Sequence, residues 1–355
     1  MNTTFAIVLG LIFGVVFEKY HFCMNSMMAD AFLFGDTQRL KGLLAALLAS
    51  AVGFNLLIGF GIVETAANPL WPTNILAGMI FGVGMVLAGG CISGTFIKMG
   101  QGYVASFFAF IGVVLGIGSL VVAMSFVQSL FASFMRGTDV KAEPVAQKTT
   151  VPELLGLNPF LFAVLATAVC ALGYGAWRLY AGRAKAAPAH TAAGNANRGW
   201  SSFVVGGVIV AVLNTIYFGL LAQPLGMAGM MAYGAAGISY LANSSWTLAN
   251  PAFGLLLKHP RMTIVGSSFL LGCALSALAH RRFRWRLPAR RQLISSVVGG
   301  FLMGLGTTMM MGCNVTHVLG GLPQFSVGSL IGTSGIVAGA WLGTRLLTRI
   351  VARAA

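Results

Sequence analysis

Long stretches without any charged residue limit the possible folds of this chain more than any other feature of its sequence. These runs are Gly42–Val63, Thr65–Ile97, Met99–Met135, Leu154–Trp177, Gly199–Leu257, Met262–His280 and Gln292–Thr344. Charged residues make up about 25% of a typical soluble domain, but only 8% of these 355 residues, and 57% are hydrophobic. A membrane-spanning helix needs about 20 mostly apolar residues, and several of the runs are long enough for two. We therefore expect an all-α polytopic membrane protein.

The apolar sequence divides into about nine membrane-spanning helices and two shorter stretches. We place the spans at 4–19, 42–63, 71–90, 102–128, 159–180, 201–221, 263–280, 292–312 and 326–349. The stretches 23–35 and 225–243 are too short or too rich in glycine to cross the membrane. Non-helical backbone at membrane depth is stable only inside the protein or beside a watery cavity. We therefore interpret both stretches as re-entrant helices.

Two polar linkers separate the chain into a first and a second half. We expect a first repeat at 1–131, with four spans and a re-entrant helix, and a periplasmic loop at 132–158. A connecting span and a cytoplasmic linker follow at 159–199, and a second, inverted repeat at 200–355.

The positions of Lys and Arg predict the orientation, because both are enriched in cytoplasmic loops. If the N-terminus is outside and the spans alternate, all but five of the 22 Lys and Arg residues lie inside. The five outside are Arg136, Lys141, Lys148, Lys258 and Arg261. We therefore expect an inner-membrane protein with a periplasmic N-terminus and a cytoplasmic C-terminus. Orientation also explains the net charge of +15, so no nucleic-acid partner is expected.

An internal repeat relates the third and eighth predicted spans. Residues 78–91, GMIFGVGMVLAGGC, align without gaps with residues 300–313, GFLMGLGTTMMMGC, at an offset of 222. The third span runs inward and the eighth outward in the expected topology. This pattern is typical of inverted repeats, whose substrate sites lie near the membrane midplane. The coinciding residues are Gly78, Gly82, Gly84, Gly90 and Cys91 with Gly300, Gly304, Gly306, Gly312 and Cys313.

Each repeated segment ends in a Gly-Cys motif whose residue types suit an anion site. We expect Gly90 and Gly312 to break the helix, and a short helix to begin after each cysteine. The free N–H groups at a helix start attract anions. His317 has two interpretations, a ligand contact or a helix cap. The neutral donors near the cysteines are Ser93, Thr95, Asn314 and Thr316.

Cysteine itself indicates the kind of anion. A thiol is a weak, polarizable donor that can hydrogen-bond the soft sulfur end of a substrate without adding charge. A thiolate would repel a dianion strongly in a low dielectric, so neutral thiols at Cys91 and Cys313 fit best. Cys23, in the first re-entrant stretch, is a candidate third thiol contact for the anion, on the cytoplasmic side.

Other residues receive plainer interpretations. A buried cysteine in a membrane helix usually acts as a small hydrophobic residue, and we expect this of Cys170 and Cys273, which lie mid-helix without flanking glycines. For Glu18 and Lys19 we expect a surface role, and for His21 a solvated one. No catalytic residue, metal site or cofactor is predicted.

Three segments resemble the YeeE/YedE family of bacterial thiosulfate (sulfur compound) transporters: HFCMNSMMADAF from His21, GGCISGT from Gly89 and GCNVTHVLGGLPQFSVGSL from Gly312. The resemblance implies an hourglass-shaped inner-membrane protein that imports thiosulfate. It also implies a relay of S–H···S contacts through Cys23, Cys91 and Cys313. Some relatives work with a small, soluble TusA-like sulfur carrier on the cytoplasmic side, and others are linked to selenium metabolism.

We therefore predict an inner-membrane transporter that takes up thiosulfate, or a related small sulfur anion, through a constriction lined by cysteines. One alternative is a membrane enzyme for sulfur transfer or thiol redox chemistry, which would need a thiolate and a nearby base or second thiol. Another is a transporter of a different oxyanion, such as selenite or sulfite.

Overall fold

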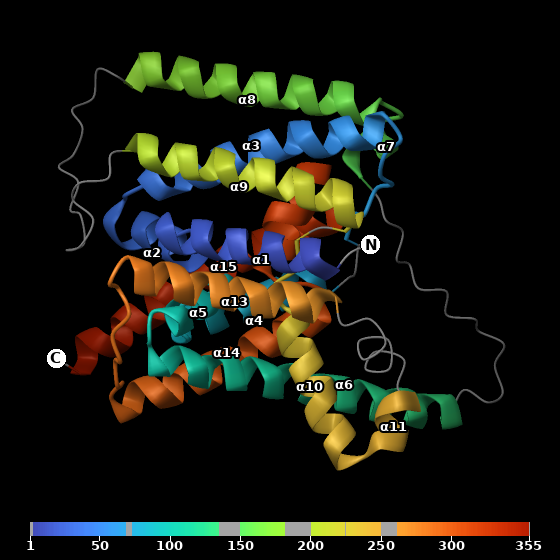
Figure 1. The fold of residues 1–355 in the computed structure, drawn as a ribbon, viewed down its shortest axis with the longest axis vertical. Helices are drawn as coiled ribbons and strands as arrows, with labels where there is room; N and C mark the ends of the chain where they lie inside the picture. Colours follow the sequence, from blue (N-terminus) through green and yellow to red (C-terminus); the bar gives the residue numbers. More distant parts are fainter. Residues whose placement is uncertain are drawn as a thin grey trace.

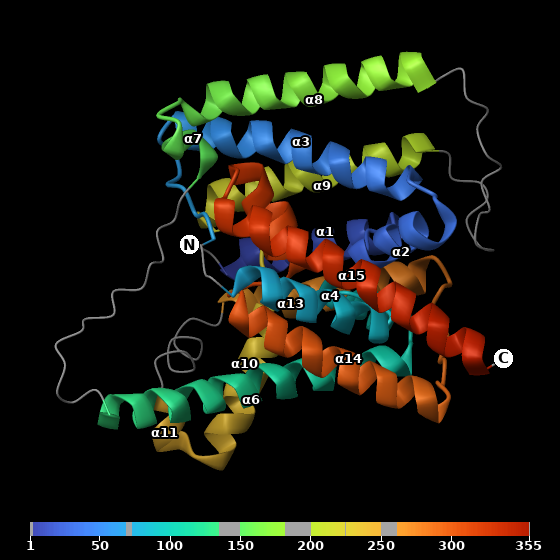
Figure 2. The same ribbon diagram turned by 180° about the vertical axis from the view of Figure 1, so that it is seen from behind.

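The computed structural model describes residues 3–68, 73–134, 150–181, 200–223, 225–249 and 261–354. These residues are mainly helical, and the long helices lie side by side with the two chain ends at opposite ends of the bundle (Figures 1 and 2). The prediction of an all-α membrane protein is confirmed. Seven helical segments of the described residues are long and apolar enough to cross a membrane, and two further apolar helices are shorter.

The first half contains α1 (Thr3–Lys19), α2 (Met24–Phe34), α3 (Gln38–Gly59), α4 (Asn74–Leu87), α5 (Ile92–Gly100) and α6 (Val104–Phe134). The short α7 (Val151–Leu154) and α8 (Pro159–Ala181) follow. The second half contains α9 (Trp200–Leu221), α10 (Gly229–Ala242), α11 (Ser244–Ala249), α13 (Arg261–Ala279), α14 (Arg290–Met309), a π-helix η1 (Val315–Gly321), a 3-10 turn η2 (Leu322–Gln324) and α15 (Val327–Ala354).

Each of the nine predicted spans coincides with a helix, and both predicted re-entrant stretches contain a short one, α2 and α10. Most of the predicted loop at 132–158 and all of the linker at 182–199 lie outside the described residues.

The long helices form four pairs, and every pair joins one helix of each half: α1 with α13, α3 with α9, α4 with α15, and α6 with α14. The two helices of a pair run in the same direction. In the α4–α15 pair, for example, Gly78 meets the backbone of Gly332, and further along Gly82 meets that of Ile336. Small residues allow such close contact between helix backbones.

Helices α4 and α14 run in opposite directions and also pack against each other. This contact joins the α4–α15 pair to the α6–α14 pair. A Cβ atom added to Gly84 would lie 2.7 Å from the Gly299 carbonyl oxygen, and one added to Gly306 would lie 2.7 Å from the Ala77 carbonyl oxygen. Gly306 is the repeat equivalent of Gly84, and Gly299 is the repeat equivalent of Ala77, both at the offset of 222. The two contacts are therefore the same contact made once from each half.

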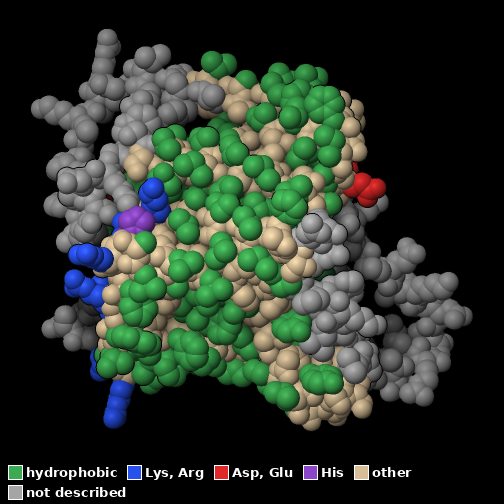
Figure 3. Space-filling model, in the orientation of Figure 1, with side chains coloured by type: hydrophobic (Ala, Val, Ile, Leu, Met, Phe, Trp, Pro, Cys, Tyr) green, Lys and Arg blue, Asp and Glu red, His purple; other side chains and the backbone are tan. Residues whose placement is uncertain are grey.

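The outer surface is hydrophobic and its charges are separated. On the face shown in Figure 3, hydrophobic side chains cover the middle of the helices, Lys and Arg lie at the end that holds the C-terminus, and acidic side chains lie at the other end. Many large side chains of this surface are exposed, including Leu165, Leu172 and Leu275. An apolar surface of this extent fits a protein surrounded by lipid.

Candidate functional site

Cys23 and Cys91 contact each other inside the protein. Their Sγ atoms lie 3.7 Å apart, and both side chains are buried. Cys23 directly precedes α2, Cys91 directly precedes α5, and no side chain caps either helix start. The first N–H groups of a helix have no intrahelical partner and form the positive end of its dipole. Two helix starts therefore converge on one pair of thiols, an arrangement that attracts an anion.

The first turn of α5 supplies the surroundings of this contact. Ser93 Oγ lies 3.3 Å from the Cys91 sulfur, as expected of a neighbouring donor. The Thr95 hydroxyl instead donates to the Cys91 carbonyl at 3.0 Å and so stabilises the turn itself. Between them, Gly94 has no side chain, and a Cβ atom there would overlap the Cys23 sulfur. The missing side chain at position 94 makes room for the thiol contact.

The second predicted break lies at Cys313, between α14 and η1. This cysteine is fully buried, with its sulfur 3.6 Å from Thr316 Oγ1. The next residue, Asn314, donates its Nδ2 hydrogen to the Met24 sulfur at 3.2 Å, and Met24 follows Cys23 in the chain. The helix after the break is a π-helix, a form often found at functional sites. All three predicted cysteines are buried in the same hydrophobic core, and the Asn314–Met24 hydrogen bond joins the Cys313 break to the segment that follows Cys23.

His317 is fully buried, and both of its ring nitrogens have partners within the protein. Nε2 lies 3.0 Å from the Met310 carbonyl oxygen. A carbonyl can only accept, so Nε2 carries the hydrogen. Nδ1 lies 3.2 Å from Ser329 Oγ, and the Asn68 amide donates to that same hydroxyl at 2.7 Å. This network ties the end of α14 to the start of α15 and favours the helix-cap interpretation of His317.

The chain turns through left-handed backbone one residue before each predicted helix-breaking glycine. Gly89, with φ of 70°, precedes Gly90, and Met311, with φ of 53°, precedes Gly312. Left-handed backbone suits glycine but strains other residues. The Lys98 ammonium group donates a hydrogen bond to the Gly89 carbonyl and so stabilises the turn before Cys91.

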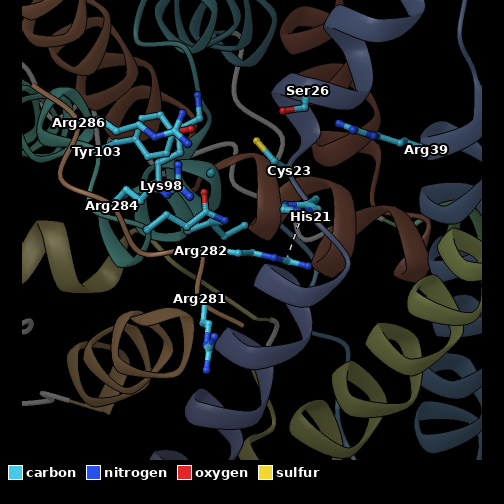
Figure 4. Close-up of a pocket in the computed structure, with 13 residues that line it drawn as sticks. His21, Cys23, Ser26, Arg39, Lys98, Tyr103, Arg281, Arg282, Arg284 and Arg286 are labelled. Atoms are coloured by element: carbon cyan, nitrogen blue, oxygen red, sulfur yellow. Dashed lines mark hydrogen bonds between the residues drawn. The ribbon is translucent and has the colours of Figure 1, made fainter. Parts of the chain in front are cut away.

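A basic cavity of about 560 Å³ opens beside Cys23 (Figure 4). Its lining includes Ser26, His21, Gln101 and Tyr103. Cys23 thus lies between its buried contact with Cys91 and a wide, positively charged cavity. In the sequence the positive charges indicate only the orientation of the chain, and no pattern predicts the cavity. The cationic residues that line it are Arg39, Lys98, Arg281, Arg282, Arg284 and Arg286.

The surface role expected for Glu18 is wrong, because this carboxylate is completely buried. It accepts hydrogen bonds from Gln101 at 2.9 Å, Ser276 at 2.7 Å and Arg282 at 3.1 Å. Glu18 thereby holds one wall of the basic cavity in place. These partners come from positions far away in the sequence.

The two remaining cysteines have different surroundings. Cys170 is exposed on the surface. Cys273 is buried, and its thiol donates to the Gly14 carbonyl at 3.3 Å, within the α1–α13 contact. The place of Cys273 agrees with the buried packing role predicted for it, whereas the same prediction for Cys170 is wrong, because that side chain is exposed.

A protein-family model described as "Sulphur transport" matches residues 20–342 of the chain. The chain belongs to this sulphur-transport family. Among its relatives, the thiosulfate transporter TsuA of Spirochaeta thermophila is 28% identical over 351 residues, which cover 97% of this chain and 98% of the relative. The protein of the same name from Escherichia coli K12 is 27% identical, over 96% of this chain and 93% of its own.

A more distant member, the probable transporter YedE of Escherichia coli K12, is 30% identical over 31% of this chain and 27% of its own. The family and these relatives are transporters rather than enzymes. The resemblance noted in the sequence motifs is therefore confirmed, and the fold and membership together describe a multi-pass membrane transport protein.

Proposed function

We propose that this protein carries thiosulfate into a bacterial cell across the inner membrane, through a constriction lined by Cys313, Cys91 and Cys23. The contact between Cys23 and Cys91 at two uncapped helix starts carries this proposal. The two full-length relatives named as thiosulfate transporters support the choice of substrate.

The chemistry of the constriction matches the two ends of thiosulfate. Neutral thiols and the Ser93 hydroxyl offer weak hydrogen bonds to the terminal sulfur, whereas the free N–H groups of α2 and α5 favour its negative charge. Since conduction needs sites that bind and also release, several weak donors in a row serve better than one strong cationic site. Cys23, which lines the basic cavity, is the last of the three thiols on the way into the cell.

The orientation follows from the charge separation. The end rich in Lys and Arg faces the cytoplasm, so the N-terminus is periplasmic and the C-terminus cytoplasmic. The two halves are an inverted repeat, and the recurrence of the α4–α14 glycine contacts at the sequence offset supports this. The site then lies where the halves meet, near the membrane midplane.

Uptake of a dianion into a negative interior costs about 2.3 kcal/mol per charge for each 100 mV. We therefore propose that consumption of thiosulfate in the cytoplasm drives uptake, with a TusA-like sulfur carrier as the acceptor.

Uptake of radiolabelled thiosulfate by the purified protein in proteoliposomes tests the proposal. Alanine at Cys23, Cys91 or Cys313 should reduce uptake at least tenfold, while Cys170→Ala serves as the matched control because that cysteine is exposed. Full uptake by the Cys91 and Cys313 variants would refute the thiol-lined route.

Two further readouts separate the alternatives. Excess unlabelled sulfite or selenite should leave thiosulfate uptake largely unchanged, and strong competition by either would favour the broader oxyanion transporter. Mass spectrometry during turnover should find Cys91 and Cys313 unmodified, whereas a persulfide on either would favour a sulfur-transfer enzyme.

A further inference from the structure

We infer that the basic cavity is a second anion site, which binds sulfate and other doubly charged sulfur oxyanions through arginine and without help from the thiols. The inference rests on the proposed function only for the identity of the anion that arrives from Cys23. The site itself follows from the lining of the cavity.

Two of the lining arginines are fixed by backbone pairing. The Arg284 N–H donates to the Gln101 carbonyl at 3.1 Å, and the Arg286 N–H donates to the Gly102 carbonyl at 3.0 Å. Alternate residues of an extended segment share a face, and the side chains of Arg284 and Arg286 both line the cavity. The loop between α13 and α14 thus presents two guanidinium groups from a held backbone rather than from a mobile turn.

Tyr103 supports the same wall. The Arg286 guanidinium carbon lies 4.7 Å from the centre of its ring, and the Lys98 nitrogen lies 5.9 Å from it. Figure 4 shows these side chains gathered on one side of Cys23, with Arg39 on the other side. Attraction to the aromatic face steadies each cation without neutralising it, so both keep their charge for a ligand.

The cavity lining holds more positive than negative charge. Among the described residues, carboxylates pair with two of the six lining cations: Asp30 with Arg39 at 3.2 Å, and Glu18 with Arg282 at 3.1 Å. Guanidinium groups bind oxyanions in a two-pronged geometry that the ammonium of lysine does not match. The excess charge and the paired arginines therefore indicate a dianionic oxyanion as the ligand class.

The size of the cavity predicts weak selectivity. One water takes about 30 Å³ of liquid volume, so a cavity of about 560 Å³ holds a small oxyanion together with part of its hydration shell. A hydrated anion is recognised by charge more than by shape. Sulfate and thiosulfate should bind alike here, and discrimination between them belongs to the thiols.

Equilibrium binding of radiolabelled sulfate to the purified full-length protein in detergent, at low ionic strength, tests the site. The double variant Arg284→Gln/Arg286→Gln should weaken binding at least tenfold. The matched control Arg290→Gln/Arg291→Gln removes the same charge from the start of α14, outside the cavity lining, and should change affinity less than twofold. The inference is wrong if wild-type protein binds no sulfate, or if both double variants lose affinity equally.

Two more measurements make the result decisive. Cys91→Ala should bind sulfate like the wild type, because this site does not use the thiols; a tenfold loss would overturn that claim. The double variant Arg284→Lys/Arg286→Lys keeps the positive charge but loses the two-pronged guanidinium geometry, so its sulfate affinity should fall between those of the wild type and the glutamine variant. An unchanged thermal midpoint of unfolding in all variants checks that they fold. Absence of thiosulfate uptake in proteoliposomes would refute the proposed function while leaving this sulfate-binding result intact.

Discussion

Replacing Gly94 by alanine tests the thiol contact most directly. The added Cβ atom would overlap the Cys23 sulfur and lie 3.6 Å from the Cys91 sulfur. The Cys23 sulfur must then shift from its present place beside Cys91, and overpacking of this kind costs about 1–3 kcal/mol. The strain falls at the proposed constriction, and a barrier raised by about 1.4 kcal/mol slows a step tenfold. We therefore expect thiosulfate uptake in proteoliposomes to fall about tenfold or more.

Gly90→Ala is the local control for this experiment. A Cβ atom there would have its nearest neighbour at 3.5 Å, an ordinary contact, so uptake should stay within about twofold of wild type. Thermal unfolding in detergent checks that both variants fold. Unchanged uptake by Gly94→Ala, or an equal loss in both variants, would refute the reasoning.

Three further predictions concern stability, each measured as the free energy or midpoint of unfolding in detergent. Glu18→Ala leaves Arg282 without its buried carboxylate and should destabilise the protein by about 2–4 kcal/mol; a loss below 0.5 kcal/mol, taken as about the size of a neutral surface substitution, would contradict this. Asn68→Ala removes a buried donor from the network around His317 and should cost about 1–3 kcal/mol, so an unchanged midpoint would show that the network contributes nothing. Met311→Gly relieves left-handed strain at an exposed side chain and should be neutral or stabilising by up to about 1 kcal/mol; clear destabilisation would refute the strain.

The sequence predicted the helices well because lipid imposes a simple requirement. Each charge-free run must satisfy its own backbone hydrogen bonds, and only a helix does so within a single segment. The break before Cys91 was also predictable, since paired glycines end a helix and a new one, α5, begins at once. After Cys313 the helix was expected but its π form was not, because no residue pattern in this segment indicates that form.

Features that depend on contacts between distant segments were not predictable. Glu18 appears in the sequence as a charge at the end of an apolar run. Its burial depends on hydrogen bonds from Gln101, Ser276 and Arg282, which lie far away in the sequence. The basic cavity needs four separate parts of the chain: the start of α2, the start of α3, α5 with the turn after it, and the loop after α13. A sequence pattern describes one segment at a time, so the same arginines that predicted orientation gave no sign that they share a cavity.

The pairing of helices across the two halves has a consequence for how the protein is made. The principal partners of α1, α3, α4 and α6 are α13, α9, α15 and α14, all from the second half of the chain, and α3 also packs against α8. During synthesis the first-half helices are made before the helices with which they pair. Until those partners have been made, the glycine faces of the first-half helices lack their final contacts. The four main helix pairs can therefore form only once α9 and the helices after it have been made, and a chain halted after α8 would hold none of them.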